Sequence, residues 1–158
     1  MADARFEDGD EGPLRLIAQA ADDLPVVSAL AQDAVFSAKD MRYDRKSRRF
    51  AVLLNRFRWE DEATARAAGR GFERVRSLLV AEDVLSVRTQ GVDPREADLV
   101  LSLLSIGFEA GEDGTGRLVL TLAGDGAIAL DVEALELRLD DVTKPYLAPS
   151  GKRPDHGL

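Results

Sequence analysis

The sequence has 158 residues, of which 45% are hydrophobic and 32% are charged, and its formal net charge is −8. A chain of this length suits one domain whose core needs no disulfide or metal. The absence of cysteine excludes disulfides, thiolate nucleophiles and cysteine metal sites. The start is acidic, unlike a signal peptide, and the longest uncharged run, Leu99 to Phe108, is shorter than the roughly 20 residues of a membrane helix. We therefore expect a cytoplasmic protein that does not span a membrane.

The charges are distributed unevenly along the chain. Residues 1–33 have a balance of −6, residues 39–76 a balance of +6, and residues 77–158 a balance of −8. An acidic protein repels nucleic acid on average. The basic middle segment is therefore the main electrostatic signal in the sequence.

The first elements along the chain are an acidic N-terminal segment, a short strand at about Leu14 to Ile17 and a helix. Residues 1–12 are acidic and poor in apolar groups, which predicts that this N-terminal segment is disordered. A single β-rich domain is expected over 13–145. Two aspartates followed by Pro25 are a helix-start signal, and apolar residues at helical spacing then predict a helix over 23–33.

From Val35 onward, the alternation of apolar and polar residues predicts strands. We expect them over 41–43, 50–58, 72–81, 84–89, 99–108, 118–122 and 128–142, the last range holding one or two strands. Residues 60–70 predict either a short helix or a loop, and 146–158 a C-terminal tail, free or docked. The predicted fold is mainly β, a single-domain antiparallel β-sandwich or barrel of about seven to nine strands with one N-terminal helix.

A shift of fifty residues along the sequence superimposes several apolar positions, such as Leu78 on Ile128. Two interpretations stay open: a duplication with units 35–93 and 98–143, or chance similarity between strand patterns. The first unit carries an extra piece at about Asn55 to Arg70. We expect this piece to lie in a surface loop, where function is more common than on strands.

Residues 32–60 resemble the most characteristic stretch of an uncharacterised bacterial family, the domain of unknown function 2948 family. The matching features are Gln32-Asp33-Ala34, Asp40 to Tyr43, Arg48-Arg49-Phe50, and Leu54 to Phe57 with Trp59. Ile128 to Asp141 and the late Pro154 and His156 are also similar. The resemblance implies a cytoplasmic bacterial setting. It implies no activity, cofactor or functional residue.

Groups suited to catalysis or metal binding are few. The single histidine, His156, is close to the C-terminus, whereas a general base needs a pocket, so we predict no catalytic residue. Only an all-oxygen metal site remains open, and the candidate acids are more typical of solvated strand edges: Asp131, Glu133, Asp140 and Asp141. The glycine-rich loops 111–116 and 124–126 lack the lysine and serine of a phosphate-binding loop. We predict no metal and no cofactor.

The basic segment 42–59 is the strongest candidate for binding. The candidate residues are Arg45, Arg48, Arg49, Asn55, Arg56, Arg58 and Trp59. Arginine pairs with phosphate and aromatic rings stack on bases, which would suit nucleic acid. The structural interpretation instead pairs these arginines with the protein's own acids, Asp22 and Asp23 among them. Within 55–59, either an exposed Trp59 is the centre of a protein contact, or Phe57 and Trp59 face the core while the arginines face outward.

The favoured functional hypothesis is a non-enzymatic binding or assembly module that is either a homodimer or bound to another protein. Binding of nucleic acid or another anion through 42–59 is the alternative, and it is not favoured. An enzyme that uses only aspartate, glutamate and arginine is the least favoured hypothesis.

Overall fold

A computed structural model describes residues 12–93, 95–148 and 153–154. The protein is mostly β, with 49% strand and 17% helix, which confirms the predicted fold class. Eleven antiparallel strands form one open sheet, somewhat more than the predicted 7–9. The predicted disordered segment 1–12 lies outside the described residues except for its last residue.

The strands are β1 (Arg15–Ala18), β2 (Val35–Ser37), β3 (Met41–Asp44), β4 (Arg49–Phe57), β5 (Glu73–Ala81), β6 (Val84–Gln90), β7 (Val100–Ala110), β8 (Gly116–Leu122), β9 (Ala127–Val132), β10 (Leu137–Asp141) and β11 (Tyr146–Leu147). The helices are α2 (Leu24–Ala31) and α3 (Glu62–Ala68), and the 3-10 turns are η2 (Ala21–Asp23), η3 (Ala38–Asp40) and η4 (Trp59–Asp61). The predicted range 128–142 therefore holds two strands, β9 and β10.

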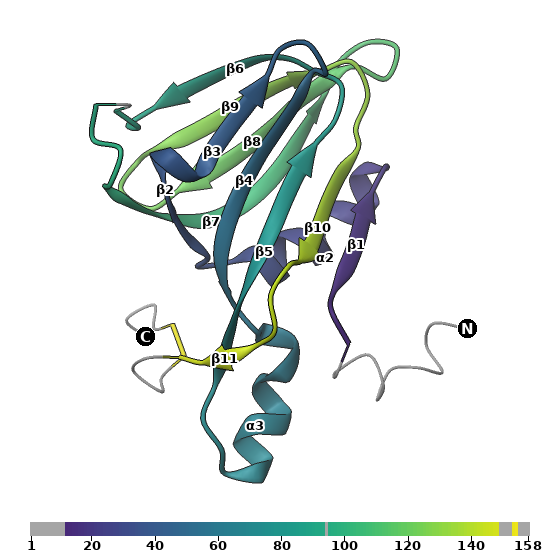
Figure 1. The fold of residues 1–158 in the computed structure, drawn as a ribbon. Helices are drawn as coiled ribbons and strands as arrows, with labels where there is room; N and C mark the ends of the chain where they lie inside the picture. The colour runs from purple at the N-terminus through teal and green to yellow at the C-terminus, as the bar shows by residue number, and fades with distance from the viewer. Residues whose placement is uncertain (1–11, 94, 149–152, 155–158) are drawn as a thin grey trace.

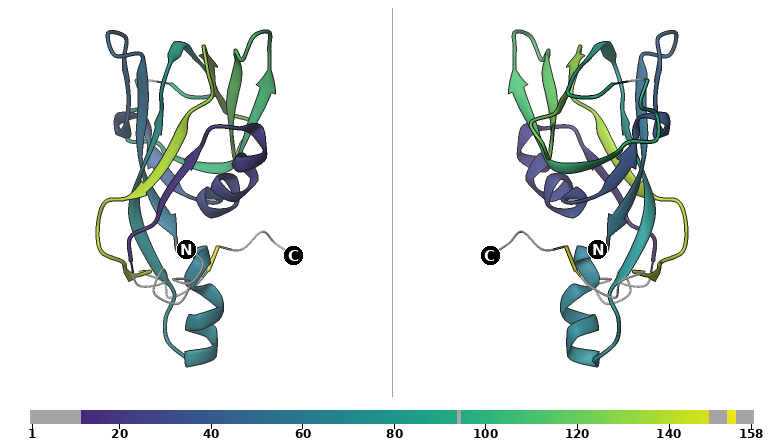
Figure 2. Two further views of the ribbon diagram at one scale, coloured as in Figure 1. Left: turned by 90° about the vertical axis from the view of Figure 1, so that its right-hand side faces the viewer. Right: turned by 90° about the vertical axis from the view of Figure 1, so that its left-hand side faces the viewer.

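The strands follow the order β1-β10-β5-β4-β2-β7-β8-β9-β6, with β3 paired to β4 and β11 paired to β5. The short strand β2 joins the two halves of the sheet because its Val35 pairs with both Asn55 of β4 and Ser102 of β7. The halves face each other (Figures 1 and 2) and enclose one apolar core. Alternate side chains of β8 and β9 enter this core, among them Leu120 and Leu130.

Each half of the sheet includes a strand that follows, in the sequence, the hairpin of the other half. The β4–β5 hairpin is flanked by β10, and the β8–β9 hairpin is flanked by β6. The predicted superposition of Leu78 on Ile128 places β5 and β9 in equivalent positions, and with them β6 and β10. A duplication of units 35–93 and 98–143 would produce this arrangement, and the duplication itself stays a prediction.

The helix predicted over 23–33 is α2, preceded by η2. Pro25 lies in its first turn, where a missing N–H leaves no hydrogen bond unmade, and Leu24, Val27 and Ala31 are buried. The Asp23 carboxylate does not cap this helix but accepts the N–H groups of Gln19 and Ala20. α2 packs mainly against β7 and so covers the open side of the sheet (Figure 2).

Of the extra piece predicted at Asn55 to Arg70, residues 55–57 belong to β4 and the rest is an insertion between β4 and β5. Residues 58–72, which we call the arm, contain η4 and α3, whereas only residues 123–126 connect β8 and β9. Figure 1 shows α3 projecting beyond the sheet. The helix ends at Gly69, whose φ of 68° is the left-handed conformation that glycine adopts without strain. The C-terminal segment docks nearby, since β11 extends the sheet along β5.

Candidate functional site

The three basic candidates of the β3–β4 turn lie at the surface. Arg48 pairs with Glu133 and, at 3.8 Å, with Asp83, while Arg49 pairs with Glu82 at 2.9 Å. Arg45 is exposed at the tip of the turn. The two paired arginines thus contact the protein's own acids, but these acids belong to the turns after β5 and β9. Asp22 and Asp23 are not their partners.

Arg56 of β4 is fully buried, with 0% of its surface exposed. Its guanidinium donates two hydrogen bonds to Glu60, at 2.8 and 2.9 Å, one to Asp141 at 3.0 Å and one to the Ser77 hydroxyl at 3.1 Å. Burial disfavours its charge, but the hydrogen bonds and charge of Glu60, and then those of Asp141, outweigh burial and raise the pKa of Arg56. This arginine is therefore a charged group of the interior.

The predicted outward orientation of Arg56 and Arg58 is wrong, because both side chains are buried. The phase of β4 is set by its apolar residues Phe50, Val52 and Leu54, which all face the core. Side chains two residues apart on a strand face the same side, so Arg56 lies on the same face as Leu54. Phe57 faces the opposite side, where the arm and the C-terminal segment cover the sheet.

Arg56 belongs to a larger arginine–carboxylate cluster at the base of the arm, formed by Arg56, Arg58, Glu60, Asp61, Arg70, Glu73 and Asp141. Arg58 pairs with Glu73 and lies 3.7 Å from Asp61. Arg70 donates two hydrogen bonds to Asp61, at 2.8 and 2.7 Å. The remaining candidate, Asn55, accepts a hydrogen bond from Arg74 through its backbone oxygen. Each charge of the cluster has a partner of opposite sign.

The cluster fixes the arm to the sheet and shows no arrangement for acid–base chemistry. Arginine does not release its proton in proteins, and these carboxylates are held by arginines. Asp141 is buried rather than on a solvated strand edge as predicted, and Asp131 accepts hydrogen bonds from Arg88 and Arg117. Within the described ranges, no group of three or more histidine, cysteine, aspartate or glutamate side chains could hold a metal ion.

Replacing Asp61 by asparagine should reduce stability in a pH-dependent way. The hydrogen bonds from Arg70 outweigh burial and, with the charges of Arg58 and Arg70, lower the pKa of Asp61. The stability from this carboxylate is therefore complete above the unfolded value of about 3.9 and is lost as the pH falls through the lower folded value. We expect Asp61→Asn to cost about 1–3 kcal/mol near neutral pH and less near pH 3, measured by urea unfolding.

Asp22, an exposed residue of η2, provides the control. Asp22→Asn should change the free energy of unfolding by no more than about 0.5 kcal/mol at either pH. An Asp61→Asn loss of equal size at both pH values would show that the charge of Asp61 is not what stabilises the arm.

Trp59 is half-buried and held on several sides. Its indole N–H donates to the backbone oxygen of Gln32 at 2.8 Å, and its ring lies 4.6 Å from that of Phe57. Arg153 from the C-terminal segment lies over the indole, 5.6 Å from its centroid, and pairs with Glu62 of α3 at 3.0 Å. Trp59 therefore anchors the arm and the C-terminal segment within the molecule. This packing favours the structural interpretation of 55–59 over an exposed Trp59, but the arginines do not face outward as that interpretation had them.

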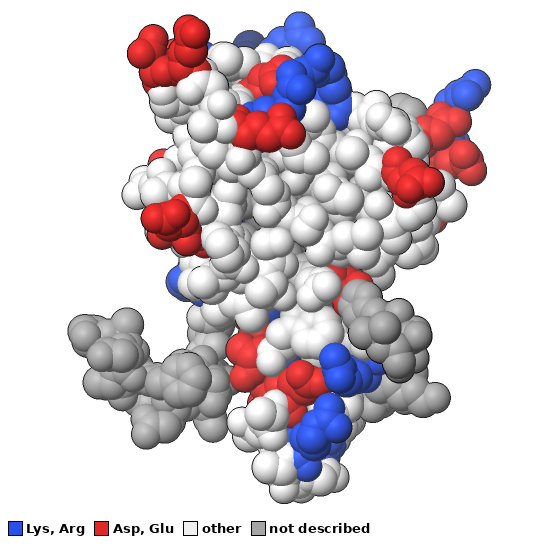
Figure 3. All heavy atoms as spheres, turned by 180° about the vertical axis from the view of Figure 1, so that it is seen from behind, with Lys and Arg blue, Asp and Glu red and all other residues white. Residues whose placement is uncertain are grey.

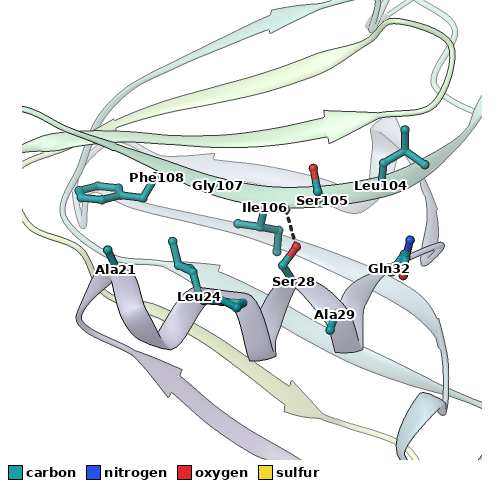
Figure 4. Close-up of a pocket in the computed structure, with 11 residues that line it drawn as sticks. Ala21, Leu24, Ser28, Ala29, Gln32, Leu104, Ser105, Ile106, Gly107 and Phe108 are labelled. Atoms are coloured by element: carbon teal, nitrogen blue, oxygen red, sulfur yellow. Dashed lines mark hydrogen bonds between the residues drawn. The ribbon is translucent and has the colours of Figure 1, made fainter.

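An open groove that the sequence analysis did not identify lies between α2 and β7. Its volume is about 440 Å³, and the residues that line it are Ala21, Leu24, Pro25, Ser28, Ala29, Gln32, Leu104, Ser105, Ile106, Gly107 and Phe108. Figure 4 shows α2 running beside β7, with Leu24 and Ser28 directed toward the strand. The Ser28 hydroxyl accepts the backbone N–H of Ile106 at 2.9 Å, which fixes the helix against the strand.

Along the groove, β7 presents a strand edge that the sheet leaves open. β8 pairs with one edge of β7 from Leu103 to Ala110, whereas β2 covers only Val100 to Ser102 on the other edge. In the described chain no strand pairs with this second edge beyond Ser102. The backbone of β7 from Ile106 to Ala110 therefore faces the space beside α2.

A protein-family model described as "Protein of unknown function (DUF2948)" matches residues 14–156. The chain belongs to the DUF2948 family. This assignment confirms the resemblance noted in the sequence, and the match includes the arm, the cluster and the groove. No curated protein and no solved structure matches the chain. In the part of the chain that the structure describes, no helix has the length and apolar character needed to cross a membrane.

In this DUF2948 chain, the groove and the basic segment differ in the side-chain groups that they offer to another molecule. Arg48, Arg49, Arg56 and Arg58 all contact carboxylates of the same chain. The groove, by contrast, offers apolar surface, two hydroxyl groups and an amide. The sequence predicts the two elements that form it, a helix over 23–33 and a strand over 99–108, but not the groove between them.

Proposed function

We propose that this DUF2948 chain is a non-enzymatic binding module whose site is the groove between α2 and β7, and whose ligand is an apolar segment of another protein. The observation that carries the proposal is the lining of the groove. Of the described residues that line it, none has a titratable side chain. Such a groove can bind and orient a ligand, but its side chains offer no general acid, general base or charged nucleophile.

The surface around the groove supports a protein ligand. The helix α2 beside the groove consists of uncharged residues. The face opposite to the view of Figure 1 has a broad area without charged side chains, bordered by separate groups of acids and, at the top and upper right, also by basic side chains (Figure 3). In a chain that is 32% charged, a continuous uncharged area on the surface is typical of an interaction site.

Nucleic-acid binding through 42–59 has weaker support. Binding to phosphate would require arginines to leave their present partners, and the buried Arg56 would have to leave the interior. Arg42, Arg45 and Lys46 of this segment are exposed, but three cations at one turn provide only part of a phosphate-binding surface.

The proposal is tested with a displayed library of random short peptides, selected on the immobilised full-length protein. The change is Ala29→Lys, which places a long charged side chain at an exposed position of the groove lining. We expect peptides selected on the wild type to bind Ala29→Lys at least about tenfold more weakly, measured by fluorescence anisotropy.

The matched control is Val26→Lys, which makes the same kind of change on the same helix at an exposed position outside the described groove lining. It should leave the affinity of the peptides unchanged. Equal binding to both variants would overturn the proposal. A homodimer detected by light scattering that dissociates in Ala29→Lys would also overturn it, since the ligand would then be a second copy of the chain.

A further inference from the structure

We infer that the segment bound in the groove is an extended strand with basic ends, which pairs with the open edge of β7 at Phe108 and Ala110. This inference rests on the proposed function, because it names the conformation and charge of the ligand for the same groove.

The backbone of β7 provides the first step. Alternate residues of an antiparallel strand direct their N–H and C=O groups to opposite edges. The N–H of Ile106 points to Ser28 of α2, whereas the N–H of Gly111 points across the β7–β8 hairpin to Thr115. Phe108 and Ala110 share the parity of Ile106, so their peptide groups face the open edge.

Ser28 fixes where an added strand can begin. Its hydroxyl occupies the N–H of Ile106, so α2 takes the place of a strand partner at that position. The next outward-facing peptide groups are those of Phe108 and Ala110, and Phe108 lies at the end of the groove where Ala21 of η2 precedes the helix (Figure 4). An extended segment can therefore form hydrogen bonds with this edge while an apolar side chain enters the groove.

The charge around the groove indicates the ends of the ligand. Neither residues 16–38, which include η2 and α2, nor residues 96–116, which include β7 and its turn, contain a lysine or an arginine. Acids flank both elements of the groove: Asp22 and Asp23 in η2, and Glu109, Glu112 and Asp113 at the end of β7. Arg117 of β8 lies opposite Glu109, but its guanidinium donates to Asp131. This local field favours a segment with lysine or arginine at its ends.

The same field disfavours a second copy of β7 as the added strand. Pairing two β7 edges would bring the acids at the end of one strand close to the acids of another copy, and like charges in that position repel. The occupant is therefore a segment of a different protein.

The test uses a synthetic probe peptide with alternating valine and threonine and two lysines at each end. Two control peptides keep the length: one has glutamates in place of the lysines, and one has methylated backbone nitrogens along one strand edge. We expect the lysine-ended peptide to bind at least about tenfold more tightly than either control.

Hydrogen exchange followed by NMR locates the peptide on the protein. The amides of Phe108 and Ala110 should become protected when the lysine-ended peptide binds. The amides of Gly107 and Glu109, which face β8, should change little. Protection at another edge of the sheet, or none at Phe108 and Ala110, would overturn the inference.

A pair of charge reversals tests the acidic border. Asp22→Lys should weaken binding of the lysine-ended peptide about tenfold and reduce its preference over the glutamate-ended one, whereas Glu96→Lys, an exposed change before β7, should have no effect. If all three peptides bind equally and Ala29→Lys still abolishes binding, the strand inference is overturned and the proposed function stands. If no binding depends on Ala29, the proposed function is overturned as well.

Discussion

Replacing Arg56 by alanine should lower the free energy of unfolding by about 3–5 kcal/mol, because it leaves the buried carboxylate of Asp141 without its arginine partner. The Ser77 hydroxyl, which also contacts Arg56 and Asp141, would compensate only in part. Urea unfolding followed by circular dichroism measures this loss.

Two further variants separate charge from position. Arg56→Lys keeps the charge but cannot form the forked pair of hydrogen bonds with Glu60, so it should show an intermediate loss. Arg45→Ala, at the exposed turn between β3 and β4, should change stability by no more than about 0.5 kcal/mol. A loss for Arg56→Ala as small as that for Arg45→Ala would contradict the structural role of the cluster.

Replacing Phe57 by alanine should cost a similar amount, about 3–5 kcal/mol, because it removes a fully buried aromatic side chain. Its ring contacts Trp59 and lies 5.8 Å from the ring of Phe72, which are the first and last aromatic groups of the arm. Trp59 is the only tryptophan in the chain, so its fluorescence reports on this position during unfolding.

The control for Phe57 is Val100→Ala on β7, where the side chain is 69% exposed and its loss should change stability by no more than about 0.5 kcal/mol. If Phe57→Ala unfolds at the same urea concentration as the wild type, the arm does not depend on aromatic packing. Retained stability with an altered Trp59 emission would locate the effect in the arm alone.

The elements that depend on local patterns were predictable. Alternation along β8 and β9, the helix-start signal before Pro25 and the glycine-rich turns all correspond to elements of the fold. The burial of Arg56 was also within reach, because the row from Phe50 to Leu54 fixes the phase of β4. The prediction failed because the aromatic residues Phe57 and Trp59 were assigned to the core face instead.

The groove and the cluster depend on contacts that sequence patterns do not contain. The partners of Arg56 come from the arm and from β10, and Asp141 is far from Arg56 in the sequence. The groove requires α2 to lie beside β7 and β2 to begin only at Val35, which pairs with Ser102 and leaves the later part of β7 without a strand on that edge. Local periodicity predicts α2 and most of the strands, but not short strands such as β2, and not which edges remain open after the sheet is assembled.

The pairing of β5 with β10 also determines when this chain can fold during synthesis. β5 is made early, but its neighbour β10 is one of the last strands to leave the ribosome, and β1 pairs in turn with β10. Until then the nascent chain carries an unpaired strand edge in its first half. Acquisition of the native state is therefore a late step dominated by distant pairings, which slows folding and prolongs exposure to aggregation.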